Sequence, residues 1–302
     1  MTLRNGLQIQ KPGHPTPMIS SQVARTVKNV LPHGLVMRYV LSEAARRRRI
    51  AAHDSAHVSV ATKQIPYNYS AAINFLTSSG LSQSEVIGGS IPEPSLSFCS
   101  KVLDEFILAT DGRPLVGLHV GNFLGVSLSH FVNYVRQRND KSVVISIDPD
   151  LTHRGIENPQ KHVIAILNHF GLQGNAVICV GYSTSKSLSN DGTPFLGDNG
   201  VEYDPYARFQ SEQSCEDTLS NLCLTSQGKF DFAVVDGNHE GSYLRRETAM
   251  VRRLLRPEGI LILDDVSDAW AEIKAEYDGL LSNGWRAIAA DGRVGVLQSG
   301  SE

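Results

Sequence analysis

Features that identify several common protein classes are missing from this 302-residue sequence. Its apolar runs, such as Ile260–Leu263, are far too short to span a bilayer. The polar N-terminus lacks the apolar core of a signal peptide. A formal net charge of −3 gives no general attraction to nucleic acid or to anionic membranes. We therefore expect a cytoplasmic protein that neither spans a membrane nor binds nucleic acid.

Cysteine is also scarce, and its spacing excludes two further classes. None of the 4 cysteines forms a Cys-x-x-Cys pair, so zinc-ribbon and thioredoxin-like motifs are absent. We expect free thiols in a reducing compartment. The content of hydrophobic residues, 41%, and of charged residues, 20%, is that of an ordinary globular protein. A chain of this length can bury one large core or two smaller ones.

The pattern along the chain predicts two parts. Residues 1–94 begin with an arm rich in proline and glycine and continue as a mainly helical extension, with a helix over 21–50. Residues 95–302 alternate between apolar strands and amphipathic helices, which predicts a parallel sheet covered on both faces. We expect strands at 115–120, 142–147, 176–180, 230–235 and 260–263, and helices at 95–109, 126–136, 159–170, 242–255 and 269–281.

The end of the chain predicts an antiparallel hairpin, with strands at 285–290 and 294–297 around an Asp-Gly-Arg turn. The fold class that follows is α/β: a doubly wound, Rossmann-like, mostly parallel seven-stranded sheet with this hairpin at its edge. The polar stretch 184–228 is too long for an ordinary connection. Its several aromatic residues suggest a lid that covers the substrate, and a surface insertion is the alternative. These residues are Phe195, Tyr203, Tyr206 and Phe209.

Polar groups that can hold a ligand follow the first three strands of this pattern. The first strand enters a loop with the spacing Gly-x-x-x-Gly, and the second ends at Asp148, which can accept the two hydroxyls of a ribose. The third ends in residues that can contact an adenine by backbone and hydroxyl groups. The candidate cofactor-binding residues are Gly121, Asn122, Gly125, Ser127, Asp148, Gly181, Tyr182 and Ser183. No Gly-x-Gly-x-x-Gly occurs, which disfavours dinucleotide binding.

Carboxylates follow the fourth and fifth strands. Asp236 comes directly after the fourth strand, with His239 three residues later, and Asp264 and Asp265 follow the fifth. Parallel strands present their carboxyl ends at one edge of a sheet, so these four residues are expected to meet there. Three carboxylates at one edge repel one another unless they are protonated or bridged by a cation. Oxygen ligands suit Mg²⁺, Mn²⁺ or Ca²⁺. The alternative is that Asp264 and Asp265 only end a strand and cap the next helix.

Together these motifs resemble the class I S-adenosylmethionine-dependent methyltransferases over about residues 95–297. The branch they resemble is that of the catechol O-methyltransferase-type enzymes and the related sugar and macrolide O-methyltransferases. The resemblance implies that S-adenosylmethionine is the cofactor and that Asp236 also contacts it. It also implies that Asp236, Asp264 and Asp265 hold a divalent cation, with Mg²⁺ preferred, and that Asp236 and His239 are catalytic.

The resemblance implies O-methyl transfer to a small hydroxylated acceptor, and no nucleic-acid or membrane partner. The segment 31–38 is similar to part of some polysaccharide-associated enzymes, which favours a carbohydrate acceptor; a homo-oligomer is possible. His119 departs from the pattern, because many relatives carry an acid at that position. We give His119 no catalytic role. Two other readings stay open: an NAD-dependent oxidoreductase, and a non-catalytic nucleotide-binding module on the same fold.

Overall fold

The computed structural model describes residues 65–107, 112–184 and 218–300. These residues all belong to one compact unit, Arg48–Glu302. The arm predicted for residues 1–20 and the helix predicted for 21–50 lie outside the described residues, as does most of the predicted insertion. Within the described part of the chain, no helix has the length and apolar character to cross a membrane.

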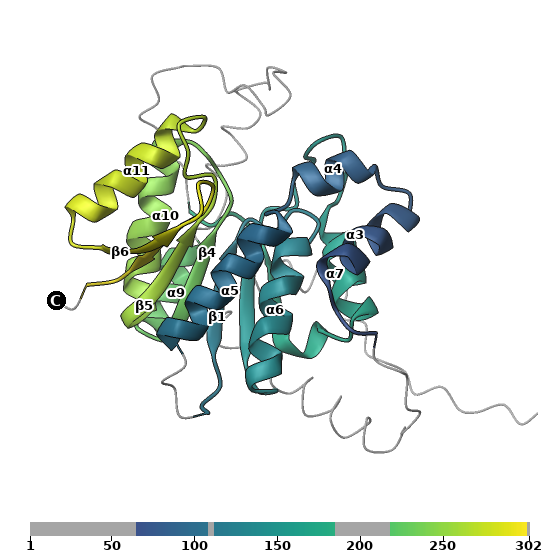
Figure 1. The fold of residues 1–302 in the computed structure, drawn as a ribbon, viewed down its shortest axis with the longest axis horizontal. Helices are drawn as coiled ribbons and strands as arrows, with labels where there is room; N and C mark the ends of the chain where they lie inside the picture. The colour runs from purple at the N-terminus through teal and green to yellow at the C-terminus, as the bar shows by residue number, and fades with distance from the viewer. Residues whose placement is uncertain (1–64, 108–111, 185–217, 301–302) are drawn as a thin grey trace, which may run out of the picture. The chain divides into compact units, whose positions relative to one another are not determined.

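The described residues form a seven-stranded sheet with the strand order β3-β2-β1-β4-β5-β7-β6 (Figure 1). Strands β1 to β5 are parallel, while β7 runs antiparallel to both β5 and β6. This confirms the predicted mostly parallel sheet with a C-terminal hairpin. The strands are β1 (Val116–Val120), β2 (Val143–Asp148), β3 (Ala176–Val180), β4 (Phe230–Val235), β5 (Leu255–Leu263), β6 (Arg286–Ala290) and β7 (Gly295–Gln298).

Helices cover the two faces of this sheet. Phe232 and Val234 of β4 share one buried core with helices α5, α6 and α7. Side chains alternate between faces along a strand, so the intervening Ala233 and Val235, which are also buried, point to the opposite side. The helices are α5 (Glu93–Ile107), α6 (Val126–Arg138), α7 (Gln160–His169), the short η1 (Gln173–Asn175), α9 (Thr218–Ser226), α10 (Gly241–Leu254) and α11 (Ala271–Ser282).

Two helices precede this α/β unit, α3 (Tyr69–Ser78) and α4 (Gln83–Gly88); they lie in the extension expected to be mainly helical, in which the sequence analysis had given bounds only for a helix at 21–50. The side chain of Asn68 accepts a hydrogen bond from the Ala71 amide at 2.8 Å and so caps α3. Helix α3 contacts both α4 and α7, and Figure 1 shows α3 next to α7. Ala72, Ile73 and Leu76 of α3 belong to the same core as residues of α6 and α7. Residues 65–94 therefore pack with the sheet domain. A domain boundary at residue 95 stays a prediction.

Two predicted elements differ from the structure. Helix α9 occupies the end of the stretch 184–228, which the sequence analysis treated as a polar insertion. Strand β5 begins at Leu255 rather than at residue 260, because Phe230 pairs with Leu255 before the pairing shifts register. Pro257 and Gly259 in that part of the strand concealed it, since both residues disfavour regular strands. Cys99, Cys179 and Cys223 are free thiols, and Cys215 lies outside the described residues.

We predict that Gly121 is the glycine most sensitive to substitution at the carboxyl edge of the sheet. Its φ is +76°, and a methyl group on it would overlap the carbonyl oxygen of Asp236. Gly112 is a matched control, because its φ is +74° and a methyl group there would meet nothing within 4 Å. Gly112→Ala should lower the free energy of unfolding by about 1–2 kcal/mol through backbone strain alone.

Gly121→Ala should lower the free energy of unfolding by about 1–3 kcal/mol more than the control, because steric overlap is added to the backbone strain. Urea unfolding of both variants measures the difference. Equal losses in the two variants would contradict the close approach of the β1 and β4 turns.

Candidate functional site

The register of the parallel strands places the predicted residues at one edge of the sheet. Val120 pairs with Ile147 of β2 on one side and with Val235 of β4 on the other, and Val235 pairs with Leu263 of β5. The next residues along each strand therefore lie side by side: Gly121, Asp148, Asp236 and Asp264. In open α/β sheets this carboxyl edge is where ligands bind.

The loop after β1 passes this edge with two glycines in left-handed conformations. Gly121 has a φ of +76° and Gly125 a φ of +83°. Because Gly121 has no side chain, its backbone lies directly against the turn after β4. Gly125 is the N-cap of α6 and offers no side-chain hydrogen bond to the first turn of that helix. The first amides of α6 are therefore available to an anionic group of a ligand.

The carboxylate of Asp148 fixes this loop. Its Oδ2 accepts hydrogen bonds from the amides of Asn122 at 2.9 Å and Phe123 at 3.2 Å, and its Oδ1 accepts one from the Asp150 amide at 2.9 Å. Asp148 is buried in this structure. Each carboxylate oxygen can accept more than one hydrogen bond, so these contacts leave capacity for ligand hydroxyls. The acid predicted to bind a ribose also holds the loop that would face the rest of the ligand.

Two other predicted residues of the loop support it from inside. The side chain of Asn122 donates to the Ser146 hydroxyl and accepts from the Gln160 amide, both at 2.7 Å. The Ser127 hydroxyl oxygen accepts a hydrogen bond from the Ile91 amide at 3.2 Å. The Asn122 side chain is thus engaged inside the protein, while Ser127 keeps its own proton for a further bond.

The turn after β3 ends in a buried polar cluster. The amide of Gly181 donates to the Asp148 carbonyl at 2.9 Å, and the Tyr182 carbonyl accepts from the Thr218 amide at 3.3 Å. Ser183 is buried, and its hydroxyl donates to Oε1 of Glu247 on α10. Gly181, Tyr182 and Ser183 were the three predicted adenine contacts. The Ser183 hydroxyl donates its hydrogen bond inside the protein, to Glu247.

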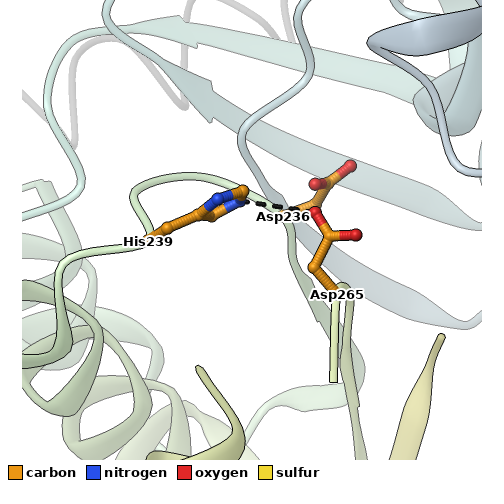
Figure 2. Close-up of side chains that lie close together, drawn as sticks. All are labelled: Asp236, His239 and Asp265. Atoms are coloured by element: carbon orange, nitrogen blue, oxygen red, sulfur yellow. Dashed lines mark ion pairs between the residues drawn. The ribbon is translucent and has the colours of Figure 1, made fainter. Parts of the chain in front are cut away.

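Three side chains from the ends of β4 and β5 converge on one point, as Figure 2 shows: Asp236, His239 and Asp265. One ligand-type atom from each lies within 4.8 Å of the others. The His239 Nε2 atom is 3.6 Å from Oδ2 of Asp265. Burial, together with the neighbouring carboxylates of Asp264 and Asp265, raises the pKa of Asp236 well above its usual value. The ionised form of Asp236 is thus disfavoured in the absence of further positive charge.

Asp264, the third carboxylate predicted for this cluster, has a different partner. The Arg293 guanidinium holds it with two hydrogen bonds, Nε to Oδ1 at 3.0 Å and Nη2 to Oδ2 at 2.8 Å. The same Nη2 lies 3.3 Å from Oδ1 of Asp265. Arg293 therefore reaches both adjacent acids at the end of β5, and its planar fork matches the carboxylate of Asp264.

Sequence reasoning missed two residues of this site. Arg293 stands in the Asp-Gly-Arg turn of the C-terminal hairpin, which had been assigned only a structural role. The predicted antiparallel hairpin could have pointed to Arg293, because the pairing of β7 with β5 brings the hairpin turn to the carboxyl edge of the sheet. Trp270 packs its ring edge-on against His239, with ring centroids 4.3 Å apart. A lone tryptophan just before a helix gave no sequence signal for this contact.

His119 needs no catalytic role. It is fully buried on β1, and its ring lies 6.0 Å from that of Phe131 on α6. Burial lowers the pKa of His119 to about 3, so the imidazole is neutral at physiological pH. This agrees with its interpretation as a structural residue.

Comparison with known proteins identifies a domain within the chain. Residues 118–266 match a family model described as a methyltransferase domain. This segment contains the end of β1 and all of β2, β3, β4 and β5, and it contains every predicted site residue. A search of curated proteins found no match.

Solved structures with similar folds share little sequence with the chain. They include the S-adenosylhomocysteine (SAH)-bound methyltransferase PaMTH1 from Podospora anserina, at 12% identity, with 84% of this chain and 96% of that chain covered and a TM-score of 0.49. The O-methyltransferase from Bacillus cereus in complex with SAH matches at 13% identity, 79% and 93% coverage, and a TM-score of 0.49. TomG from Streptomyces achromogenes, in complex with SAM, matches at 14% identity, 82% and 96% coverage, and a TM-score of 0.48.

We predict that removing the Arg293 guanidinium destabilises the protein. Arg293→Met should lower the free energy of unfolding by about 2–5 kcal/mol, because it leaves the buried Asp264 carboxylate without its charged partner. Arg286→Met is the matched control: Arg286 lies on the same hairpin and contacts Gln298 instead.

The control should change stability by no more than about 0.5 kcal/mol, and adding Asp264→Asn to Arg293→Met should recover part of the loss. Chemical unfolding of the three variants measures these differences. A loss in Arg293→Met no larger than in Arg286→Met would contradict the assigned ion pair.

Proposed function

We propose that the chain, whose residues 118–266 match the model of a methyltransferase domain, is an O-methyltransferase that uses S-adenosylmethionine. One observation carries the proposal: the strand register aligns the glycine loop, Asp148 and Asp236 along a single edge of the sheet. This edge offers amides for a carboxylate, an acid for a ribose and a further acid beside the loop. Those are the groups that the amino-acid and nucleoside parts of this cofactor require.

Each part of the cofactor has a proposed partner. The amino-acid part lies against the loop after β1, where Gly121 and Gly125 admit a close approach and the first amides of α6 receive the carboxylate. Asp148 accepts the ribose hydroxyls while it keeps its bonds to the loop amides. The adenine lies against the turn after β3, within reach of the backbone of Gly181 and Tyr182.

The residues after β4 face the position of the methyl acceptor in this proposal. His239 is the proton acceptor: its Nε2 takes the proton of the acceptor hydroxyl as the oxygen attacks the methyl carbon. The new carbon–oxygen bond forms while the carbon–sulfur bond breaks, and the electron pair stays on sulfur. The protein's part is to align donor and acceptor and to hold this proton. Edge-on packing by Trp270 fixes the plane of the imidazole.

The donor set fits a divalent cation. Asp236, His239 and Asp265 each offer one atom within 4.8 Å of the others, and a cation there would stabilise the ionised form of Asp236, whose pKa is raised by burial and by the neighbouring carboxylates. We propose Asp236 and Asp265 as the ligands, with Asp264 turned toward Arg293 as a neighbouring support. A bound Mg²⁺ would supply Lewis-acid polarisation of an acceptor hydroxyl.

The proposed acceptor is a small molecule that carries a ring and neighbouring hydroxyl groups, a sugar or a natural product. Two features support it. Carboxylates and a histidine can contact hydroxyls, and Trp270 offers an aromatic surface beside them. Aromatic surfaces suit the apolar faces of such rings.

We predict that Asp148→Ala weakens the binding of SAH, the product of the proposed reaction. Loss of hydrogen bonds to a charged acceptor should cost about 1.5–3 kcal/mol, which is an increase in Kd of about 10- to 150-fold. Titration calorimetry measures it. Asp231→Ala is the control for damage to the fold.

Asp231 is also a buried acid that accepts a backbone hydrogen bond, from the Val116 amide at 2.7 Å, but at the opposite edge of the sheet. Its substitution should lower stability and leave the Kd for SAH unchanged. Unaltered SAH affinity in Asp148→Ala, or an equal loss in both variants, would refute the placement of the ribose.

We predict different effects for His239 and Asp265. His239→Ala should lower kcat by about 10²–10⁴-fold, the usual contribution of a general base, and leave Mg²⁺ and SAH affinities unchanged. Asp265→Asn should instead weaken Mg²⁺ binding. Calorimetry with Mg²⁺, and methyl transfer to the best acceptor from a panel of catechols and sugars, separate the two.

A loss of Mg²⁺ affinity in His239→Ala equal to that in Asp265→Asn would make His239 a ligand rather than the base. Full activity in excess chelator would show that the carboxylates are structural.

A further inference from the structure

A buried glutamate on α10 has no role in the site described so far. Glu247 is 1% exposed, and its Oε1 accepts a hydrogen bond from the Ser183 hydroxyl in the turn after β3. Its Oε2 is buried and has no hydrogen-bond partner among the described residues. An ionised carboxylate with an unsatisfied oxygen is costly in such a place, whereas a neutral carboxylic acid is tolerated far better.

The same carboxyl group also lies at the turn after β4. A methyl group on Gly237 would stand 3.7 Å from Oε1 of Glu247 and 3.6 Å from Val120 Cγ1. Gly237 follows directly on Asp236, and its turn lies against the Gly121 backbone. One side chain of α10 therefore lies between two turns that come from separate strands of the sheet.

A second contact strengthens the link to the turn after β3. The Tyr243 hydroxyl, one helical turn before Glu247, is 3.1 Å from the Ser183 hydroxyl and 3.4 Å from the amide of Thr184. Ser183 and Thr184 are both buried. Glu247 and Tyr243 of α10 thus both contact the turn after β3.

We propose that Glu247 is a positioning residue of the cofactor site: as a neutral carboxylic acid it ties the turn after β3 to the turn after β4. This inference rests on the proposed function, because these are the turns that would face the adenine and the sulfur. Glu247 acts through Ser183 and Gly237 and does not touch the reacting atoms. Its ionisation would place an uncompensated charge between the two turns and loosen them.

The electrostatic surroundings agree with a neutral acid. Burial raises the pKa of Glu247 to about 8, and the Ser183 hydrogen bond lowers it only in part. The Ser183 hydroxyl bonds to the carboxyl, and the Tyr243 hydroxyl in turn contacts Ser183; neither contact supplies a positive charge. On the neighbouring α11, Glu276 bonds to Thr248 at 2.7 Å, and Arg245 acts on Glu276. After β4, burial raises the pKa of Asp236, the charges of Asp264 and Asp265 raise it further, and Arg293 lowers it.

The direction of the pH effect follows from this pKa. A carboxyl whose pKa is 4.5 in the unfolded chain and about 8 in the folded protein opposes folding increasingly as pH rises between these values. Below pH 4.5 the group is neutral in both states and has no effect. Glu247→Gln copies the neutral acid, so its gain in melting temperature over wild type should grow from pH 5 to pH 8 and then level off.

We predict that SAH binding by the wild-type protein shares this dependence. If only the neutral form holds the two turns, the Kd for SAH should be about tenfold higher at pH 9 than at pH 7. Glu247→Gln should bind SAH with the wild-type pH 7 affinity at both pH values. Glu247→Ala should bind about tenfold more weakly at both, through loss of the hydrogen bond to Ser183.

Glu276→Gln is the matched control, because Glu276 is also a buried acid on a neighbouring helix, where it accepts a hydrogen bond from Thr248. Its Kd for SAH should follow that of the wild type at every pH. Calorimetry with SAH at pH 7, 8 and 9 tests all four proteins, and Glu247→Gln keeps the test valid if Glu247→Ala does not fold. If the SAH affinity of Glu247→Gln falls with pH as much as that of the wild type, the positioning role is overturned. Wild-type SAH affinity in Glu247→Ala overturns it as well.

The failure of the proposed function looks different. Wild-type protein that binds no SAH at pH 7 overturns the assigned cofactor, and the positioning role with it. Wild-type protein that binds SAH with the same Kd at every pH overturns the positioning role alone.

Discussion

The parallel pairing of β1 with β2 and β4 sets the position of every group in the site. Because Val120 pairs with both Ile147 and Val235, the glycine loop, Asp148 and Asp236 leave the sheet at the same level. The turns after β1 and β4 then come so close that a side chain on Gly121 would overlap the Asp236 carbonyl oxygen. Backbone amides at this edge are satisfied by Asp148, and the helix that follows begins at once. A ligand at the edge therefore meets a surface whose geometry is fixed by strand pairing and by hydrogen bonds from backbone amides to the buried Asp148 carboxylate.

Charge is distributed unevenly along this edge. The side that we assign to the cofactor carries Asp148, whose carboxylate is held by three backbone amides. The side that we assign to the acceptor carries three carboxylates and one guanidinium, which pairs closely with Asp264 and more loosely with Asp265. Burial, and after it the charges of Asp264 and Asp265, raises the pKa of Asp236 well above its usual value, although Arg293 acts in the opposite direction. A cation held by Asp236 and Asp265 would stabilise the ionised form of Asp236, which is the physical reason for assigning one there.

Local patterns in the sequence predicted most of the sheet, because β-branched apolar runs such as Phe230–Val235 pack on both faces. They also predicted that Asp236, His239 and Asp265 would meet, since strand ends align in a parallel sheet. What they could not predict depends on long-range pairing. The Asp264–Arg293 contact joins β5 to the hairpin turn, and the Glu247–Ser183 contact joins α10 to β3. Helix α3 escaped prediction for a similar reason, since its buried face packs against helices that come much later in the chain.

The central claim is that the carboxyl edge of this sheet binds the nucleoside and amino-acid parts of S-adenosylmethionine. Thermal unfolding of the wild-type protein with saturating SAH, with saturating NAD and with neither ligand tests it most directly. A ligand that binds only the folded state raises the free energy of unfolding, by about 2.7 kcal/mol at a concentration 100 times its Kd, and so raises the melting temperature. The account predicts that SAH raises the melting temperature and that NAD leaves it unchanged. A rise with NAD and none with SAH would contradict it.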